Sequence, residues 1–166
     1  VDEKHPTSFL SPYAITKNAS EQFIKYCGID YIIFRYANVY GPGQDCFGEA
    51  GVVAKFFDLM NQNKPIQVHG NGKQYRDFIY VEDVAKANIL ALQTDIQNEI
   101  INVSTNNRTS INELVKIMKA ELDYELEPEY TSPRAGDIEK SVLSNEKLIS
   151  LFHYTPQIDI YTGIKK

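Results

Sequence analysis

Residues 11–17 of the chain are Ser11-Pro12-Tyr13-Ala14-Ile15-Thr16-Lys17, a segment that places a tyrosine and a lysine four positions apart. On a helix, residues i and i+4 project from the same face, so the Tyr13 phenol and the Lys17 ammonium are expected side by side. A nearby ammonium stabilises a phenolate and lowers the tyrosine pKa from its usual value of about 10. A tyrosine tuned in this way can accept a proton from a sugar or alcohol hydroxyl near neutral pH, which makes Tyr13 a candidate general base.

The spacing of this pair is not diagnostic by itself, because roughly one Tyr–Lys pair at i and i+4 is expected by chance in a chain of this composition. A second pair does occur, Tyr161 and Lys165, and we interpret it as accidental. Tyr161 lies in a short terminal segment, whereas Tyr13 opens a helix that leads into a buried strand. The local context therefore favours Tyr13 and Lys17 as the functional pair.

That context is a helix over residues 11–27 followed by a strand near 30–36. Ser11 can cap the helix, and Pro12 suits its first position. Apolar residues then recur every three to four positions, and Gly28 provides a stop. The next apolar run is flanked by turn-type residues and predicts a buried strand.

The rest of the sequence continues this alternation of helices and strands. Further helices are expected over 51–62, 82–93, 111–122 and 144–152, and further strands over 66–68, 78–81, 100–104 and 126–131. The stretch 37–51 holds four glycines and is predicted to be a long loop of functional importance. Ser110 and Glu113 form a capping-box pattern before the fourth helix. The alternation predicts an α/β fold.

Composition narrows the classes of function. The chain has 166 residues, enough for one domain, and its apolar and charged fractions of 43% and 23% are typical of a soluble protein. The net charge of −5 disfavours a nucleic-acid or membrane surface as the main partner. No apolar run approaches a membrane span, and no signal peptide is recognisable. Two isolated cysteines and three histidines without ligand spacing predict no disulfide and no metal site, and indicate a cytoplasmic location.

Five stretches, in order, resemble the extended short-chain dehydrogenase/reductase family in its nucleotide-sugar epimerase/dehydratase branch. They lie at residues 11–17, 34–44, 70–85, 101–104 and 133–137, and the resemblance covers nearly the whole chain. Within the branch, the sequence is most similar to the 4-epimerases of the UDP-glucose/UDP-galactose type. One such stretch would be a weak signal, but five in the expected order are specific.

The resemblance implies a mechanism for the Tyr–Lys pair. Tyr13 would be the general base, and Lys17 would hold the nicotinamide ribose and depress the Tyr13 pKa. The proton would leave the sugar 4-hydroxyl while a hydride passes to NAD. The 4-keto sugar would then turn over and take the hydride back on its other face.

The resemblance also implies four substrate-binding residues. Asn38 would contact the diphosphate or the sugar, Arg76 and Arg134 would clamp the diphosphate, and Asp137 would bind the uridine ribose. The chemistry agrees, because guanidinium forks match phosphate oxygens bidentately. By residue type alone Asn38 could be a turn former, and the arginines could form surface ion pairs: Arg76 with Asp77 or Glu82, and Arg134 with Asp137.

The family's glycine fingerprint for NAD is absent from these 166 residues, and Gly41-Pro42-Gly43 is the nearest approach. We therefore expect the C-terminal part of a Rossmann-like enzyme, lacking the N-terminal dinucleotide-binding strands. Residues 1–36 and 82–104 would complete the nucleotide-binding sheet, and residues 37–81 and 105–166 would form the substrate-binding lobe. Apolar faces left without their sheet partners would be exposed, so the isolated chain is expected to self-associate and to bind NAD poorly.

Three hypotheses follow from the sequence. The first is an NAD-dependent UDP-sugar 4-epimerase, a homodimer when full length, represented here by a portion that is inactive alone. The second is a close relative such as a 4,6-dehydratase, a decarboxylase or an epimerase for another nucleotide sugar. The third is a non-catalytic module that binds UDP-sugars. The identity of the hexose is not encoded in any motif that we recognise.

Overall fold

The structure is a computed structural model that describes residues 1–9, 11–47, 51–134 and 136–166. Its first helix, α1 (Pro12–Tyr26), begins as the sequence predicts, because the Ser11 hydroxyl accepts a hydrogen bond from the Ala14 N–H at 3.2 Å. After the helix ends, Gly28 adopts a φ of 65°, a left-handed conformation that glycine tolerates best.

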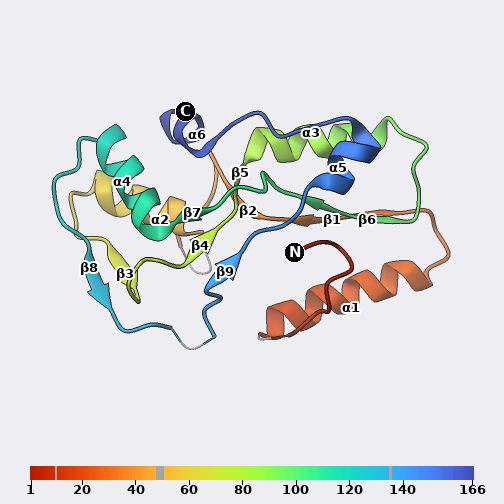
Figure 1. Ribbon diagram of the computed structural model, residues 1–166, viewed down its shortest axis with the longest axis horizontal. Helices are drawn as coiled ribbons and strands as arrows, with labels where there is room; N and C mark the ends of the chain where they lie inside the picture. Colours follow the sequence, from red (N-terminus) through yellow and green to blue (C-terminus); the bar gives the residue numbers. More distant parts are fainter. Residues whose placement is uncertain (10, 48–50, 135) are drawn as a thin grey trace.

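A parallel pair of strands organises one end of the molecule. β1 (Ile32–Tyr36) runs parallel to β6 (Glu99–Val103), with Ile32 opposite Glu99 and Tyr36 opposite Val103. In Figure 1, α3 (Val81–Leu92) and α5 (Glu146–Phe152) lie above this pair and α1 lies below it. The buried core here consists of Ile79, Val84, Ala87, Ile101, Val103 and Leu148.

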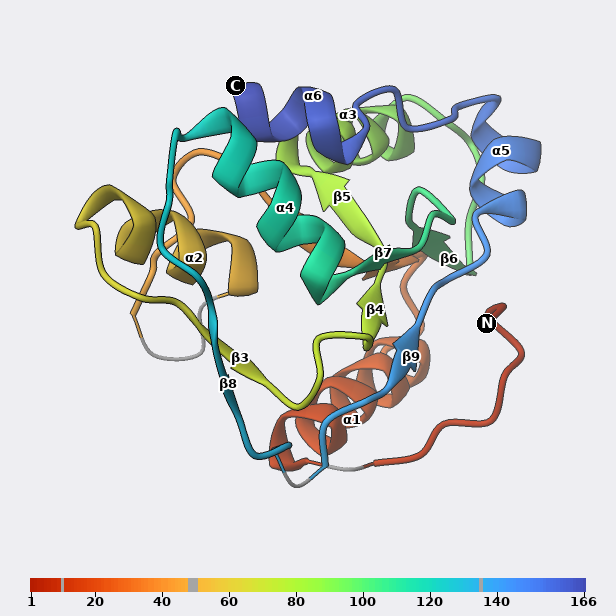
Figure 2. The same cartoon turned by 60° about the vertical axis from the view of Figure 1, so that its left-hand side comes forward.

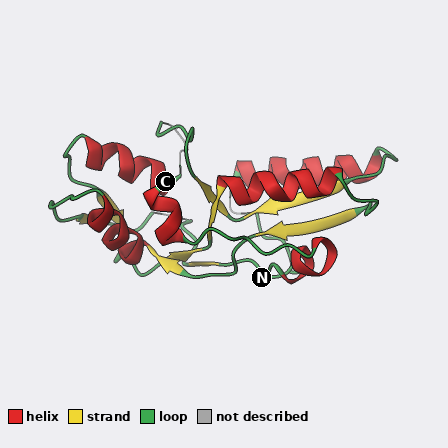
Figure 3. Ribbon diagram, turned by 90° about the horizontal axis from the view of Figure 1, so that it is seen from above, coloured by secondary structure: helices red, strands yellow, loops and turns green. Residues whose placement is uncertain are grey.

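A second core lies at the other end, under α2 (Val52–Asn61), α4 (Ile111–Glu121) and α6 (Ile160–Lys165). Figure 3 shows the helices gathered in these two groups, with strands running between them. The two ends are joined by β2 (Asn38–Tyr40), which continues from β1 and pairs in parallel with β5 (Phe78–Tyr80). The second core contains Tyr40, Val53, Phe56, Met60, Ile66, Val68, Phe78, Tyr80, Ile111, Leu114, Val115, Met118 and Tyr124.

Short strands complete the second end. β3 (Gln67–His69) pairs in parallel with β8 (Glu129–Thr131). β4 (Tyr75–Arg76) lies between β7 (Thr109–Ser110), which is antiparallel to it, and β9 (Lys140–Ser141), which is parallel. Strand β4 thus brings together segments that are more than thirty residues distant in sequence.

Most predicted elements occur, but the prediction of a single loop over 37–51 is wrong. Its first residues form β2, while residues 48–50 lie outside the described part of the chain. No local pattern predicted β4, β7, β9 or α6. Two- and three-residue strands are too short to show an alternating pattern, so tertiary pairing determines them.

Helix α6 is fixed by close contact with β2. The Asp159 carboxylate caps it by accepting the Thr162 N–H at 2.7 Å. A Cβ atom on Gly163 would lie only 2.0 Å from the Tyr40 hydroxyl oxygen, so glycine is required where the helix crosses the ring. Burial raises the pKa of the Tyr40 phenol, and the nearby Asp159 carboxylate adds to this effect.

Candidate active site

Tyr13 and Lys17 lie on the same face at the start of α1, as their spacing predicts. The Lys17 Nζ atom is 5.4 Å from the centre of the Tyr13 ring. The Tyr13 side chain is 60% exposed, so its hydroxyl is accessible to a ligand. The geometry thus places an ammonium over the ring of an accessible phenol.

The second Tyr–Lys pair lies in a different environment. Tyr161 and Lys165 belong to α6, which the sequence did not predict. The Lys165 ammonium lies 3.3 Å from the Glu121 carboxylate and so links α6 to α4. Lys165 therefore has a structural partner on another helix, whereas the Lys17 ammonium lies over the tyrosine ring.

Arg76 and Asp137, 61 positions apart in the sequence, form an ion pair. The Arg76 Nη2 atom donates to Asp137 Oδ1 at 2.6 Å, and Nη1 donates to the Tyr75 carbonyl at 3.0 Å. From the sequence, the alternative ion-pair partners considered for Arg76 were Asp77 and Glu82. The structure shows Asp137 as its partner instead. The structure brings together two residues that the resemblance assigns to one binding site.

Arg134 belongs to the same turn as Asp137. The Asp137 N–H donates to the Arg134 carbonyl at 3.2 Å, and the Arg134 side chain is exposed. In Figures 1 and 2 the chain between β8 and β9, which carries this turn, lies on the same side of the molecule as the N-terminal end of α1. The Tyr–Lys pair and the arginine turn therefore belong to the same side.

Asn38 is exposed at the first position of β2, and not in the loop expected from the sequence. Its backbone N–H donates to the Asp77 carbonyl at 2.8 Å. Since Asp77 directly follows Arg76, this bond places the predicted Asn38 and Arg76 on adjacent segments.

Asp77 itself is a buried carboxylate that the sequence interpretation missed. It is 1% exposed and accepts hydrogen bonds from the Thr105 N–H and hydroxyl, at 3.0 and 2.7 Å, and from the Asn106 N–H at 3.0 Å. Burial raises the pKa of Asp77, although these bonds act in the opposite direction. The only sequence signal was a charged residue at the edge of the apolar run 78–81.

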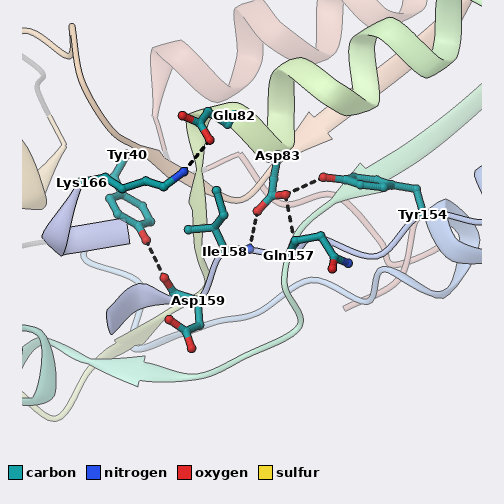
Figure 4. A network of polar contacts seen from close by, with 8 residues as sticks. All are labelled: Tyr40, Glu82, Asp83, Tyr154, Gln157, Ile158, Asp159 and Lys166. Carbon is teal, nitrogen blue, oxygen red and sulfur yellow. Dashed lines mark hydrogen bonds and ion pairs between the residues drawn. The ribbon is translucent and has the colours of Figure 1, made fainter. Parts of the chain in front are cut away.

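A second buried carboxylate, Asp83, anchors the C-terminal segment. It is 3% exposed and accepts bonds from the Tyr154 hydroxyl at 2.5 Å and from the Gln157 and Ile158 N–H groups at 2.9 Å (Figure 4). Burial, together with Asp83, raises the pKa of Tyr154. Asp83 thus fixes the chain that leads into α6 and contacts none of the predicted site residues through these bonds.

A pocket of about 480 Å³ lies apart from these residues. It is bordered by the segment 40–46, α2 and α6. The described residues that line it include none of the predicted catalytic or substrate-binding side chains.

In the described ranges, no three His, Cys, Asp or Glu side chains gather as a metal site. None of the described helices has both the length and the apolarity needed to cross a bilayer.

Comparison with known proteins identifies the family. Residues 1–104 match the NAD dependent epimerase/dehydratase family. The chain belongs to this family. A protein of Methanocaldococcus jannaschii named "Putative UDP-glucose 4-epimerase" is 46% identical over 170 residues, which cover 100% of this chain and 55% of that protein. The dTDP-D-glucose 4,6-dehydratase of Mus musculus is 34% identical, with 99% of this chain and 48% of the mouse protein covered.

A solved structure shares the fold. The crystal structure of UDP-glucose 4-epimerase with UDP-glucose from Thermotoga maritima superimposes with a TM-score of 0.92 at 38% identity, covering 99% of this chain and 54% of that one. The expected α/β Rossmann-like class is confirmed. The chain spans about half the length of the curated relatives it matches.

The family's cofactor is NAD. The exposed Tyr13 hydroxyl and Lys17 ammonium can both bond to ribose hydroxyls. The glycine fingerprint that would hold the diphosphate of NAD is absent from these 166 residues. The chemistry of Tyr13 and Lys17 is thus compatible with binding a ribose of this cofactor.

Proposed function

We propose that this chain carries the catalytic and substrate-binding residues of an NAD-dependent nucleotide-sugar 4-epimerase of the UDP-glucose/UDP-galactose type. The observation that supports this most is the accessible Tyr13 phenol beside the Lys17 ammonium on the first turns of α1. The relative from M. jannaschii and the solved structure that holds UDP-glucose support the choice of substrate.

In this proposal Tyr13 takes the proton from the 4-hydroxyl of the sugar and later returns it. Lys17 orients the nicotinamide ribose beside the phenol. NAD, when bound, supplies the acceptor for the hydride from the same carbon. Because the phenol and the ammonium sit on one helical face, a single element sets the position of the proton acceptor relative to the cofactor.

Arg76, Arg134, Asp137 and Asn38 hold the nucleotide part of the substrate. The two guanidinium groups bind the diphosphate, Asp137 binds the uridine ribose, and Asn38 contacts the diphosphate or the sugar. The ion pair between Arg76 and Asp137 supports this assignment, because it keeps a cation and a ribose-binding carboxylate adjacent before the substrate arrives.

We further propose that the two ends of the molecule divide this work. Residues 1–36 and 82–104, which contain α1 and the β1–β6 pair, complete the nucleotide-binding sheet. Residues 37–81 and 105–166 form the substrate-binding lobe. In the cell we expect the full-length protein to be a cytoplasmic homodimer.

A second candidate is a nucleotide-sugar 4,6-dehydratase, which the similarity to the mouse dehydratase favours. A decarboxylase uses the same first oxidation and is a third option. A non-catalytic UDP-sugar-binding module would retain Arg76 and Asp137 but have no need of the Tyr–Lys pair. Product analysis separates these options, since only an epimerase releases a sugar of unchanged mass.

The test is Tyr13→Phe in the complete gene product. The substitution removes the proton acceptor and little binding surface, so we expect kcat for interconversion of UDP-glucose and UDP-galactose to fall by about 100-fold or more. The dissociation constant of UDP, measured by calorimetry, should change less than about twofold. The matched control is Tyr161→Phe, which alters the other Tyr–Lys pair and should leave kcat unchanged.

Retention of most of the kcat in Tyr13→Phe would remove Tyr13 from the role of base. A wild-type protein that turns over no nucleotide sugar but binds UDP would support the non-catalytic module.

A further inference from the structure

Asp77 connects the predicted substrate-binding residues from a buried position. Its Oδ1 atom accepts the two bonds from Thr105, and its Oδ2 atom accepts the N–H groups of Asn106 and Leu143, the latter at 3.4 Å. Its backbone carbonyl accepts the N–H of Asn38 at 2.8 Å. One residue therefore joins β2, the loop after β6 and the segment after β9.

Two of these segments, β2 and the one after β9, adjoin groups of the proposed site. Asn38 begins β2, and Arg76 is the residue that precedes Asp77. The segment that reaches Leu143 contains β9, in which Ser141 is the direct partner of Arg76. Asp137 lies just before β9 and forms the ion pair with Arg76. The buried carboxylate thus bonds, through the Leu143 N–H, to the segment that follows the strand paired with Arg76.

We propose that Asp77 is a positioning residue that holds Arg76 and the Asp137 turn in the geometry that binds the nucleotide diphosphate. This inference rests on the proposed function. In this proposal Asp77 does not touch the substrate, because its carboxylate is buried and is occupied by groups of the chain itself.

The chemistry of the four donors explains why a carboxylate is needed. Both oxygens of an ionised aspartate accept, and all four partners donate. In Asp77→Asn, one oxygen becomes an NH₂ group that faces donors, so either the Thr105 side or the Leu143 side loses its anchor. Leu143 follows β9, which pairs with the strand of Arg76, so we expect the loss to displace Arg76 relative to Asp137.

Asp83 provides a matched control in the same chain. It is also buried, and it accepts bonds from two backbone N–H groups and one hydroxyl, where Asp77 accepts from three N–H groups and one hydroxyl. Its partners belong to residues 154–158, which lead into α6 and include no predicted site residue. Asp83→Asn should therefore cost stability without a change in substrate affinity.

The experiment uses the complete gene product and the variants Asp77→Asn, Thr105→Val and Asp83→Asn. For Asp77→Asn we expect the KM for UDP-glucose and the dissociation constant of UDP to rise about tenfold or more, with kcat within about threefold of wild type. Thr105→Val removes the hydroxyl bond to Oδ1, along with the hydroxyl's longer bonds to the Phe78 carbonyl and the Asn107 N–H, and keeps the backbone bond to Oδ1. It should raise the dissociation constant of UDP about threefold. Asp83→Asn should lower Tm and leave the dissociation constant within about twofold.

A dissociation constant in Asp77→Asn equal to that in Asp83→Asn, at comparable losses of Tm, would overturn the inference. If Asp77→Asn does not fold, Thr105→Val decides, and wild-type affinity in that variant overturns the inference. A wild-type protein that binds no UDP refutes the proposed function and the positioning role together. Wild-type UDP binding with an unaffected Asp77→Asn refutes only the positioning role.

Discussion

Arg134 is the arginine of the proposed site whose guanidinium remains exposed, since Arg76 is paired with Asp137. A charge-assisted bond from Arg134 to the diphosphate would be worth about 1.5–3 kcal/mol, so Arg134→Ala should weaken UDP-sugar binding by that amount. Calorimetric titration with UDP-glucose measures the change. Arg108→Ala is the control, because Arg108 lies over the Tyr75 ring at 5.5 Å and has no assigned role in binding. An unchanged dissociation constant in Arg134→Ala would exclude it from the site.

At the scale of single residues, the candidate catalytic side chains could be predicted from the sequence, but the buried residues and their long-range partners could not. The spacing of Tyr13 and Lys17 was sufficient to place both on one face, because helical geometry fixes it. The partner of Arg76 could not be predicted, since Asp137 reaches it only through the pairing of β4 with β9. Asp77 was missed for the same reason: its charge is visible in the sequence, but the donors that surround it come from distant segments.

At the scale of elements, α1 is held to the rest of the chain by a polar contact. The helix has no buried residue, and Arg35 of β1 donates two bonds to the Glu21 carboxylate, at 2.8 and 2.7 Å. These bonds hold the pKa of Glu21 below its ordinary value of 4.5, against the opposing effect of partial burial. The stabilisation is thus complete above pH 4.5 and is lost as the pH falls through the lowered pKa of the folded state.

We expect Glu21→Gln to weaken docking of α1 on β1 by about 0.5–1 kcal/mol at neutral pH, as is usual for a partly exposed ion pair. Amide hydrogen exchange of α1, compared with wild type, measures this loss. The difference should shrink as the pH falls below 4.5 and through the lowered pKa of Glu21, because the wild-type carboxylate then takes up a proton. Glu127→Gln removes a far more exposed ion pair with Lys119 and should have no effect on α1. A difference that persists unchanged at low pH would contradict this account.

The predictability of elements follows their length and their end signals. α1 and α4 were predicted within about one residue, because a serine cap starts each and a regular apolar period follows. β4, β7 and β9 have two residues each, too few to carry any period, and exist only because they pair with one another. The Arg76–Asp137 contact depends on these short strands, so the part of the site that binds the nucleotide was the least predictable from local pattern.

At the scale of the whole molecule, the side that carries α1 is left with a large apolar surface. Phe23 is 72% exposed and Tyr26 is 93% exposed, and Ile15 on the same helix is 55% exposed. A hollow beside them is lined by Ala19, Gln22, Phe23, Tyr26 and Cys27. Contiguous exposed apolar residues of this kind mark association sites in soluble proteins. The chain spans about half the length of its curated relatives. The exposed apolar side chains of α1 form the surface that another part of a protein would bury most favourably.

We therefore expect the 166-residue chain alone to self-associate through this surface. Light scattering should give a mass above the 18.9 kDa of a monomer at micromolar concentration, and Phe23→Ser should shift the mass toward the monomer. Tyr161→Ser is the matched control, because Tyr161 is an exposed aromatic residue on α6 in the second group of helices. If the wild-type chain is a clean monomer with a sharp cooperative melt, the apolar face of α1 is tolerated in water and requires no partner. If Phe23→Ser and Tyr161→Ser reduce association equally, the contact is unspecific and does not involve α1 in particular.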